Sequence, residues 1–186
     1  MQQYQWRVSL AQGRQSVRLS PQGIWIGERV YPWADLRDVG FVRYQTRQGA
    51  NEELALTFED GTKRILQWTG AWHQRAAWRE MLVALAQMAA RKRPDLDLRD
   101  GPDAQQQAAA RSIGLGVTGV ALAIAAVVFL ASEAVVGVLV AAWIGGVGGG
   151  VGLLIFRHYS RRGPSPRLDW ASFAAREGQE GHLPAN

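Results

Sequence analysis

Residues 113–156 read IGLGVTGVALAIAAVVFLA, then Ser132-Glu133, then AVVGVLVAAWIGGVGGGVGLLIF. The only charged residue in this stretch is Glu133. The two apolar runs, 113–131 and 134–156, contain 19 and 23 residues, and about 20 apolar residues are enough to cross the hydrocarbon core of a bilayer. Neither run has the polar face that a surface helix of a soluble domain carries. The sequence therefore predicts a two-helix transmembrane hairpin within residues 111–157.

Arginines flank the predicted hairpin but are absent from its turn. Arg99 and Arg111 precede the first run. The basic residues after the second run are Arg157, Arg161, Arg162 and Arg167. Because arginine-rich flanks stay on the cytoplasmic side, we expect a two-pass protein of the inner (plasma) membrane with both termini cytoplasmic. Residues 158–186 are predicted to be a basic juxtamembrane segment and a flexible tail, with one interfacial turn at 168–173.

Small residues recur every four positions in the second run. They are Gly137, Ala141, Gly145 and Gly149. Such a ridge lets helix backbones approach closely, and Gly116 and Gly119 offer small residues on the first run. We predict that these six residues pack the hairpin chiefly against itself. Self-association through the remaining glycine face is the alternative.

Residues 114–119, GLGVTG, match the G-x-G-x-x-G pattern of dinucleotide-binding loops. That pattern binds a cofactor only between a strand and the helix of a βαβ unit. Here a Gln/Ala-rich, helix-favouring segment precedes it and an uninterrupted apolar helix follows. We therefore expect no nucleotide and no other cofactor.

Residues 1–93 have the pattern of a folded soluble domain. Apolar and polar residues alternate in short runs near residues 6–10, 16–20 and 54–59, which predicts half-buried antiparallel strands. Turn signals separate them, the strongest being Asp60-Gly61. After Gly70 the apolar period changes to that of a helix, with Trp78, Leu82 and Leu85 on one face, and Pro94 ends it. The fold class is therefore α+β.

Two further motifs give this domain a resemblance. Residues 30–36 read VYPWADL ahead of a strand, and Leu54-x-Leu-x-Phe-x-Asp-Gly61 follows. With one terminal helix, this pattern resembles the bacterial membrane-associated PH-like domains of the pleckstrin-homology superfold, over about residues 4–93. The resemblance implies an antiparallel β-barrel or sandwich of six to seven strands capped by a C-terminal helix. It also implies a module that binds lipid, peptide or itself.

Arginines near the first predicted hairpin mark a candidate interaction surface. They are Arg7, Arg14 and Arg18, and Trp25 is expected to point outward because Ile24 and Ile26 have the opposite phase. Eukaryotic lipid-binding PH domains carry a basic cluster at this place, but here no lysine accompanies the arginines. We expect chiefly a solvated, membrane-facing strand edge.

Several function classes are disfavoured by composition. The chain has no cysteine, so disulfides and thiolate metal sites are excluded, and its three histidines are too far apart in sequence to form a metal cluster. No nucleophile elbow is present, and we expect no enzyme. Residues 1–110 hold 15 basic and 12 acidic side chains, which does not favour nucleic-acid binding.

The sequence thus favours a noncatalytic interaction module anchored in the membrane at its cytoplasmic face. Its expected role is scaffold or regulator of a membrane-protein complex, with a membrane-protein partner or a homo-oligomer and the lipid bilayer as its contacts. The alternatives are an oligomeric transmembrane pore or transport subunit built on the Gly/Ala-rich helices, and a lipid-sensing module. Residues 94–110 are expected to be a linker, so a fragment ending near Pro94 should fold alone.

Overall fold

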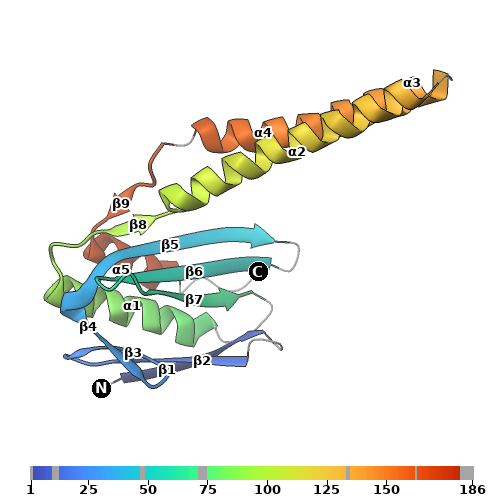
Figure 1. The fold of residues 1–186 in the computed structure, drawn as a ribbon. Coiled ribbons are helices and arrows are strands. Elements are labelled where there is room, and N and C mark those ends of the chain that lie inside the picture. Colours follow the sequence, from blue (N-terminus) through green and yellow to red (C-terminus); the bar gives the residue numbers. More distant parts are fainter. Residues whose placement is uncertain are drawn as a thin grey trace. The chain divides into compact units, whose positions relative to one another are not determined.

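The computed structural model describes residues 2–9, 13–46, 49–70, 75–132, 135–161 and 163–180. The chain forms two compact units, one made of Met1–Pro102 with Pro166–Asn186 and the other of Asp103–Ser165. The first unit, here the folded unit, contains the strands and two helices (Figure 1). The second, the hairpin unit, is inserted into it and contains the two long apolar helices.

A four-stranded antiparallel sheet opens the folded unit. Its order is β1 (Gln2–Ser9), β2 (Gly13–Leu19), β3 (Gly23–Ile26) and β4 (Arg29–Pro32). Trp6, Val8 and Val17 are at most 1% exposed, as the alternation of apolar and polar residues predicts. Gly27 has φ 63° in the turn between β3 and β4, a conformation that favours glycine.

A second sheet has the order β7-β6-β5-β8-β9. The short 3-10 helix Trp33–Asp35 leads into β5 (Leu36–Thr46), which pairs antiparallel with β6 (Gly49–Phe58), and β6 pairs antiparallel with β7 (Lys63–Thr69). On the other side of β5 lies β8 (Leu98–Asp100), in parallel, and then β9 (Arg167–Leu168), antiparallel to β8. In the predicted β6–β7 turn, Gly61 has φ 76° and hydrogen bonds from Thr62 lower the pKa of Asp60.

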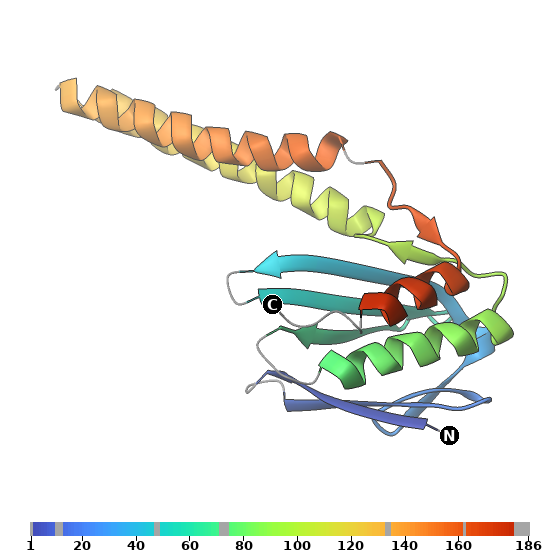
Figure 2. The same cartoon turned by 180° about the vertical axis from the view of Figure 1, so that it is seen from behind.

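Two helices complete the folded unit, α1 (Arg75–Lys92) and α5 (Trp170–Glu180). They pack against each other, and Figure 2 shows them side by side in front of the strands. The predicted apolar face of α1 is confirmed, because Trp78, Leu82 and Leu85 are fully buried. The Trp78 ring meets that of Trp6 from β1 edge to face, with centroids 5.0 Å apart. The core therefore lies between the sheets and the two helices.

The α+β class and the seven strands before α1 are as predicted, but the boundaries of the folded unit differ. The segment 94–110 was expected to be a linker, yet it contains β8 and the first turns of a helix. Residues 158–186 were expected to be a juxtamembrane segment and flexible tail, yet they contain β9 and α5. Trp170 and Phe173 are 3% and 0% exposed, so burial of aromatic surface offsets the entropy lost on ordering this segment.

The hairpin unit consists of α2 (Ala104–Ala131), followed by α3 (Val135–Trp143), the π-helical turn η2 (Ile144–Gly148) and α4 (Gly149–Arg161). A capping box begins α2, since the Asp103 carboxylate accepts from the Gln106 N–H at 2.6 Å and the Gln106 side chain accepts from the Asp103 N–H. The two helical segments Ala104–Ala131 and Val135–Arg161 are long and apolar enough to cross a membrane. The predicted turn residue Glu133 lies outside the described residues.

Candidate functional site

The four residues predicted to form an interaction surface come together on one face of the β1–β4 sheet. Arg7 and Arg14 are cross-strand partners on β1 and β2, and Arg18 and Trp25 are cross-strand partners on β2 and β3. The Arg18 guanidinium carbon lies 4.8 Å from the centre of the Trp25 ring. This contact is a cation–π interaction, worth about 0.5–1 kcal/mol at an exposed site.

This face, here the outer sheet face, points away from the core. Val17, Leu19 and Ile24, which alternate with its members, are at most 1% exposed. Trp25 is half-buried beside Arg18, on the face opposite the buried Ile24, and its role as a contact residue stays a prediction. Three arginines and one indole on the same sheet face make a surface suited to an anionic or aromatic partner.

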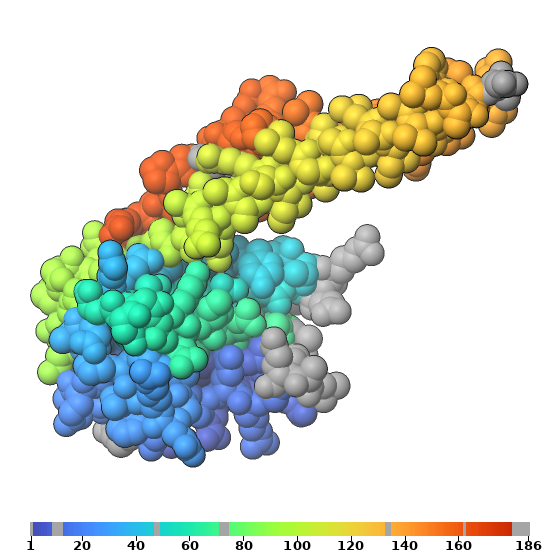
Figure 3. All heavy atoms as spheres, viewed as in Figure 1, coloured from blue at the N-terminus to red at the C-terminus, as the bar shows by residue number. Residues whose placement is uncertain are grey.

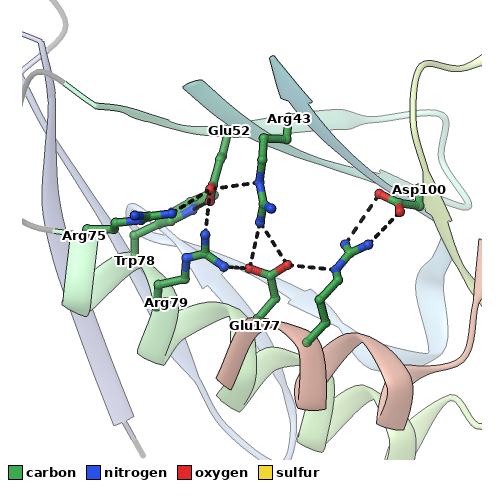
Figure 4. Close-up of polar contacts among 8 residues, drawn as sticks. Arg43, Glu52, Arg75, Trp78, Arg79, Asp100 and Glu177 are labelled. Carbon is green, nitrogen blue, oxygen red and sulfur yellow. Dashed lines mark hydrogen bonds and ion pairs between the residues drawn. The ribbon is translucent and has the colours of Figure 1, made fainter. Parts of the chain in front are cut away.

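A network of buried charges lies on the other side of the folded unit (Figure 4). Its first centre is Glu52 of β6, which is 0% exposed. The Glu52 carboxylate accepts hydrogen bonds from Trp78 Nε1 at 2.7 Å and from Arg79 Nη2 at 2.8 Å. Arg43 Nε lies 3.1 Å from it, and Arg75 Nη2 lies 4.0 Å away. These donors supply the hydrogen bonds and the opposite charge that offset the desolvation penalty of a buried carboxylate.

The second centre is Glu177 of α5, also 0% exposed. Arg43 Nη2 donates to both of its oxygens at 3.2 Å, and Arg79 Nη1 forms an ion pair with it. Arg176 Nε donates to the same carboxylate at 3.2 Å and, through Nη1, to Asp100 of β8 at 2.7 Å. Arg43 and Arg79 are thus shared between two carboxylates from distant parts of the chain. The network joins β5, β6, α1, α5 and β8.

A groove of about 450 Å³ borders this network. Its lining residues are Gln2, Tyr4, Ala76, Arg79, Glu80, Val83, Ala84, Gln87, Glu177 and Gly178. Burial, and secondarily the negative charge of Glu80, raises the pKa of Tyr4 above its usual value. Both effects disfavour the phenolate form of Tyr4.

The hairpin is closely packed through small residues, as predicted, but only partly through the predicted ones. Ala141 is 6% exposed, and a Cβ built on Gly145 would lie 3.3 Å from Ala125 Cβ of α2. At Gly149 the neighbour is Leu122, at 3.7 Å. These three ridge residues therefore face α2, and in Figure 3 the side chains of the two helices touch along the yellow and orange part of the hairpin.

The predicted small residues of α2 were the wrong ones. Apart from their own helix backbone and chain neighbours, no atom of the described residues lies within 4 Å of a Cβ built on Gly116 or on Gly119. The close approach is made at Gly114, two residues before Gly116, where a Cβ on Gly152 would lie 2.6 Å from the Gly114 carbonyl oxygen. Thr118 Oγ1 also donates to the Gly149 carbonyl at 3.3 Å. Which glycines of α2 face the partner depends on the rotation of both helices, and the π turn η2 shifts that rotation.

Gly137 faces the end of α2 at the turn of the hairpin and not the length of that helix. A Cβ built there would clash with the Ser132 side chain, which ends α2. Gly137 thus makes room for the end of the neighbouring helix. It belongs to the same small-residue ridge by sequence, but its neighbour in the structure is the cap of α2.

The predicted membrane-proximal arginines fall into two groups. Arg157 and Arg161 lie in the last turns of α4 and are exposed, where they also complement the helix dipole. Arg167 lies in β9 of the folded unit, and Arg162 lies outside the described residues. Arg111 of α2 donates from Nε to the Tyr159 carbonyl at 3.1 Å, which ties the base of the hairpin together.

Sequence reasoning missed the charge network because its members are far apart in the chain. One signal was present: Trp170, Phe173 and Glu177 recur at the spacing of one helical face, and Asp169 precedes them as an N-cap. The Asp169 carboxylate accepts from the Ser172 N–H at 2.8 Å and from its hydroxyl at 2.7 Å, and these bonds lower the pKa of Asp169.

Within the described residues there is no group of three or more His, Asp or Glu side chains that could hold a metal ion. The charge network, the outer sheet face and the small-residue interface of the hairpin are therefore the features that bear on function. No protein-family model, no curated protein and no solved structure matches the chain.

Proposed function

We propose that this chain is a noncatalytic interaction module, anchored in the inner membrane by its helical hairpin and exposed at the cytoplasmic face. The module would act as a scaffold or regulator of a membrane-protein complex. The observation that carries this proposal is the pairing of β8 with β9, in which Leu98 opposes Leu168 and Arg99 opposes Arg167. These strands are the last element before the hairpin and the first after it.

That pairing restricts topology. Asp100 N–H donates to the Pro166 carbonyl at 2.8 Å, so both flanks of the hairpin belong to one sheet. A folded sheet lies on one side of a bilayer, because unpaired strand edges and loops cannot enter lipid. The pairing therefore supports an even number of membrane crossings, which a hairpin of two helices would provide.

The surface of the hairpin supports a lipid environment. Leu130, Val135 and Leu154 are 82%, 77% and 68% exposed. Burying apolar surface is worth about 25 cal/mol per Å², so a hairpin with apolar side chains on all its outer faces is far more stable in lipid than in water. Arg111, Arg157 and Arg161 at its base favour the cytoplasmic side for the flanks.

The arrangement of the first ninety residues supports the PH-like assignment. A four-stranded sheet is followed by three antiparallel strands and one helix, α1. The strands β8 and β9 and helix α5 are additions to that arrangement. The buried carboxylates Glu52 and Glu177 are held by arginines on several sides, which favours a structural role over acid–base chemistry. The outer sheet face is the surface proposed to contact the partner.

Topology is tested with single cysteines in this cysteine-free chain. Cysteines at Gln2, Ser132 and Ser172 would be exposed to an impermeant thiol reagent in intact cells. We expect labelling at Ser132 only, since Gln2 and Ser172 belong to the same folded unit. Labelling at Gln2 and Ser172 but not at Ser132 would invert the orientation, and labelling at only one of Gln2 and Ser172 would contradict a folded unit that lies on one side of the membrane.

The binding role is tested by affinity purification of the full chain from membranes in mild detergent. The test variant carries Arg18→Ala and Trp25→Ala, and the matched control carries Arg37→Ala, another exposed strand arginine. We expect a stoichiometric partner with the unchanged chain and the control, and its loss with the double variant. If mass spectrometry finds the same co-purifying proteins with the unchanged chain, the double variant and the control, the outer sheet face is not the binding surface.

A further inference from the structure

Strand β7 forms one edge of the second sheet (Figure 1). It pairs with β6, and no strand of the described chain pairs with its other side. At Gln67 that side is taken up by the first sheet: the Gln67 N–H donates to Gln15 Oε1 at 3.1 Å, and the Gln67 carbonyl accepts from Trp6 Nε1 at 2.7 Å. Two side chains thus satisfy the backbone of Gln67 in place of a neighbouring strand.

Ile65 lies two residues before Gln67, and its register with β6 is unbroken. Backbone groups of successive residues point to alternate sides of a strand, so the N–H and C=O of Ile65 point to the same side as those of Gln67. No side chain of the described residues bonds to them there. The Ile65 side chain is 42% exposed. The edge therefore offers an open donor, an open acceptor and an apolar side chain at one residue.

A groove of about 450 Å³ borders this edge. One of its walls is β7, through Ile65 and Leu66. The other wall includes β2 where it extends past β3, because β3 pairs with β2 only over Val17–Leu19 and ends at Ile26. Ligand sites commonly have volumes of about 300–1,000 Å³. Because the groove has a second wall, it suits a single extended chain better than the sheet of a second copy.

The charge of the groove indicates what that chain carries. Arg14 and Arg64 line it and are exposed, and the described lining residues include no Asp or Glu. Arg64 Nε donates to the Tyr31 hydroxyl at 2.6 Å, which holds the guanidinium group at the groove. Arg64 and Ile65 have opposite phases in β7. In an added strand, a residue opposite Ile65 would contact that apolar side chain, and its neighbours would lie on the side of Arg64, where opposite charge is favoured.

We propose that the edge of β7 at Ile65 is a peptide-binding site, which takes an extended segment of alternating acidic and apolar residues as an additional strand. Main-chain hydrogen bonds supply affinity in this mode of binding, and alternate side chains supply specificity. The site shares only Arg14 with the outer sheet face. The inference depends neither on the membrane assignment nor on the binding role of that face.

The probe is the blocked peptide Glu-Val-Glu-Val-Glu, and its control is Lys-Val-Lys-Val-Lys. Binding to the full-length protein in detergent is measured by fluorescence anisotropy of the labelled peptides. Amide exchange is followed by NMR of the protein labelled with ¹⁵N-isoleucine, in which Ile65→Val identifies the Ile65 signal. At about ten times the Kd of the acidic peptide, exchange at Ile65 should slow about tenfold. Exchange at Ile24, which is paired within the first sheet, should not change.

Two substitutions at one position separate the backbone from the side chain. Ile65→Pro removes the outward N–H but no hydrogen bond to β6, and edge strands tolerate proline. It should raise the Kd of the acidic peptide by about tenfold or more, because a hydrogen bond is lost and the ring obstructs the edge. Ile65→Val keeps the N–H and should leave the Kd within about twofold. Thermal unfolding shows whether both variants fold, and the exchange experiment on the unchanged chain stands without them.

Equal affinity for the acidic and the basic peptide would overturn the selection for acidic residues. Binding of the acidic peptide without slower exchange at Ile65, or no binding at about 1 mM peptide, would overturn the site itself. Exchange at Ile65 that slows with protein concentration in the absence of peptide would assign the edge to a second copy of the chain, and the peptide would be the wrong occupant.

Discussion

The Arg79 guanidinium pairs with the Glu177 carboxylate and so joins the helix that precedes the apolar hairpin to the helix that follows it. Both side chains are almost completely buried. Such a pair contributes specificity because either charge alone would be costly to bury. It makes the folded unit depend on sequence from both sides of the hairpin.

The first prediction concerns how much of the chain the folded unit needs. A fragment ending at Pro94 lacks β8, β9 and α5. Phe41 therefore loses its contact with Phe173, and Arg79 loses its ion pair with Glu177. We now expect this fragment to be mostly unfolded or aggregated, contrary to the expectation from sequence. Far-UV circular dichroism and urea denaturation would measure this.

A hairpin-free chain is the matched comparison. Replacing Asp103–Ser165 by a Gly/Ser loop of about five residues, a length common in β-hairpins, should give a soluble protein with one cooperative unfolding transition. The short loop suffices because β8 and β9 are already hydrogen-bonded neighbours. If the Pro94 fragment proves as stable as this chimera, α5 adds nothing to the core.

The second prediction concerns Glu52. Glu52→Gln should lower the free energy of unfolding of the hairpin-free chimera by about 3–5 kcal/mol, because two or more guanidinium groups lose their buried counter-charge. The control is Glu53→Gln on the same strand, where the partner is the Gln67 side-chain amide at 3.2 Å and a glutamine oxygen can still accept from it. That change should cost less than about 1 kcal/mol. Similar losses for both would show that the network is not a major source of stability.

The third prediction separates the inner and outer glycines of the hairpin. Gly152→Ala should destabilise the full-length protein in detergent by about 1–3 kcal/mol through overpacking, because its Cβ would press on the Gly114 carbonyl. Gly116→Ala meets open space and should be neutral or stabilising by up to about 1 kcal/mol through helix propensity. A fluorescence thermal shift measures both. Should Gly116→Ala instead break an oligomer, the outer glycine face is an interface between subunits.

The fourth prediction is a pH dependence at the N-cap of α5. Hydrogen bonds from the Ser172 N–H and hydroxyl lower the pKa of Asp169 in the folded state. A lowered folded pKa gives stability that is present above the unfolded value of about 3.9 and is lost as pH falls toward the folded value. The hairpin-free chimera should therefore lose this contribution below about pH 4.

Asp169→Asn isolates that effect. Asparagine caps helices about as well as aspartate but does not titrate. The Tm difference between the two chimeras should therefore shrink between pH 5 and pH 3, while the other carboxylates titrate alike in both. A difference that is constant over this range would show that the charge of Asp169 does not support α5.

Local patterns predicted the parts of the fold that rest on neighbours in sequence. β1 was identified by the alternation that buries Trp6 and Val8, and α1 by the helical spacing of Trp78 and Leu82. In both elements the period of the apolar residues is enough to predict which side chains are buried. The apolar runs identified α2 and the helices after it because each run is long and uninterrupted by charged residues. Arg7, Arg14, Arg18 and Trp25 were placed on one surface by strand phase.

The features that the sequence did not predict depend on contacts between residues that are far apart in the chain. β8 has three residues in a segment rich in Asp and Pro, and only contact with β5 makes it a strand. α5 lies in a polar tail, and its burial depends on Phe41, Arg43 and Arg79. Gly116 and Gly119 were wrongly assigned to the helix interface. Their spacing shows which small residues share a helix face, but it does not fix how that face is rotated toward the partner helix.

Joining Arg79 to Glu177 also sets an order of events during synthesis. The ribosome completes α1 well before it makes α5, and at about 5–20 residues per second the intervening chain takes roughly 5 to 20 seconds to emerge. Throughout that interval the Glu177 carboxylate, which pairs with Arg43 and Arg79 in the finished chain, has not yet been made. The folded unit is therefore completed only after the whole hairpin has been synthesised.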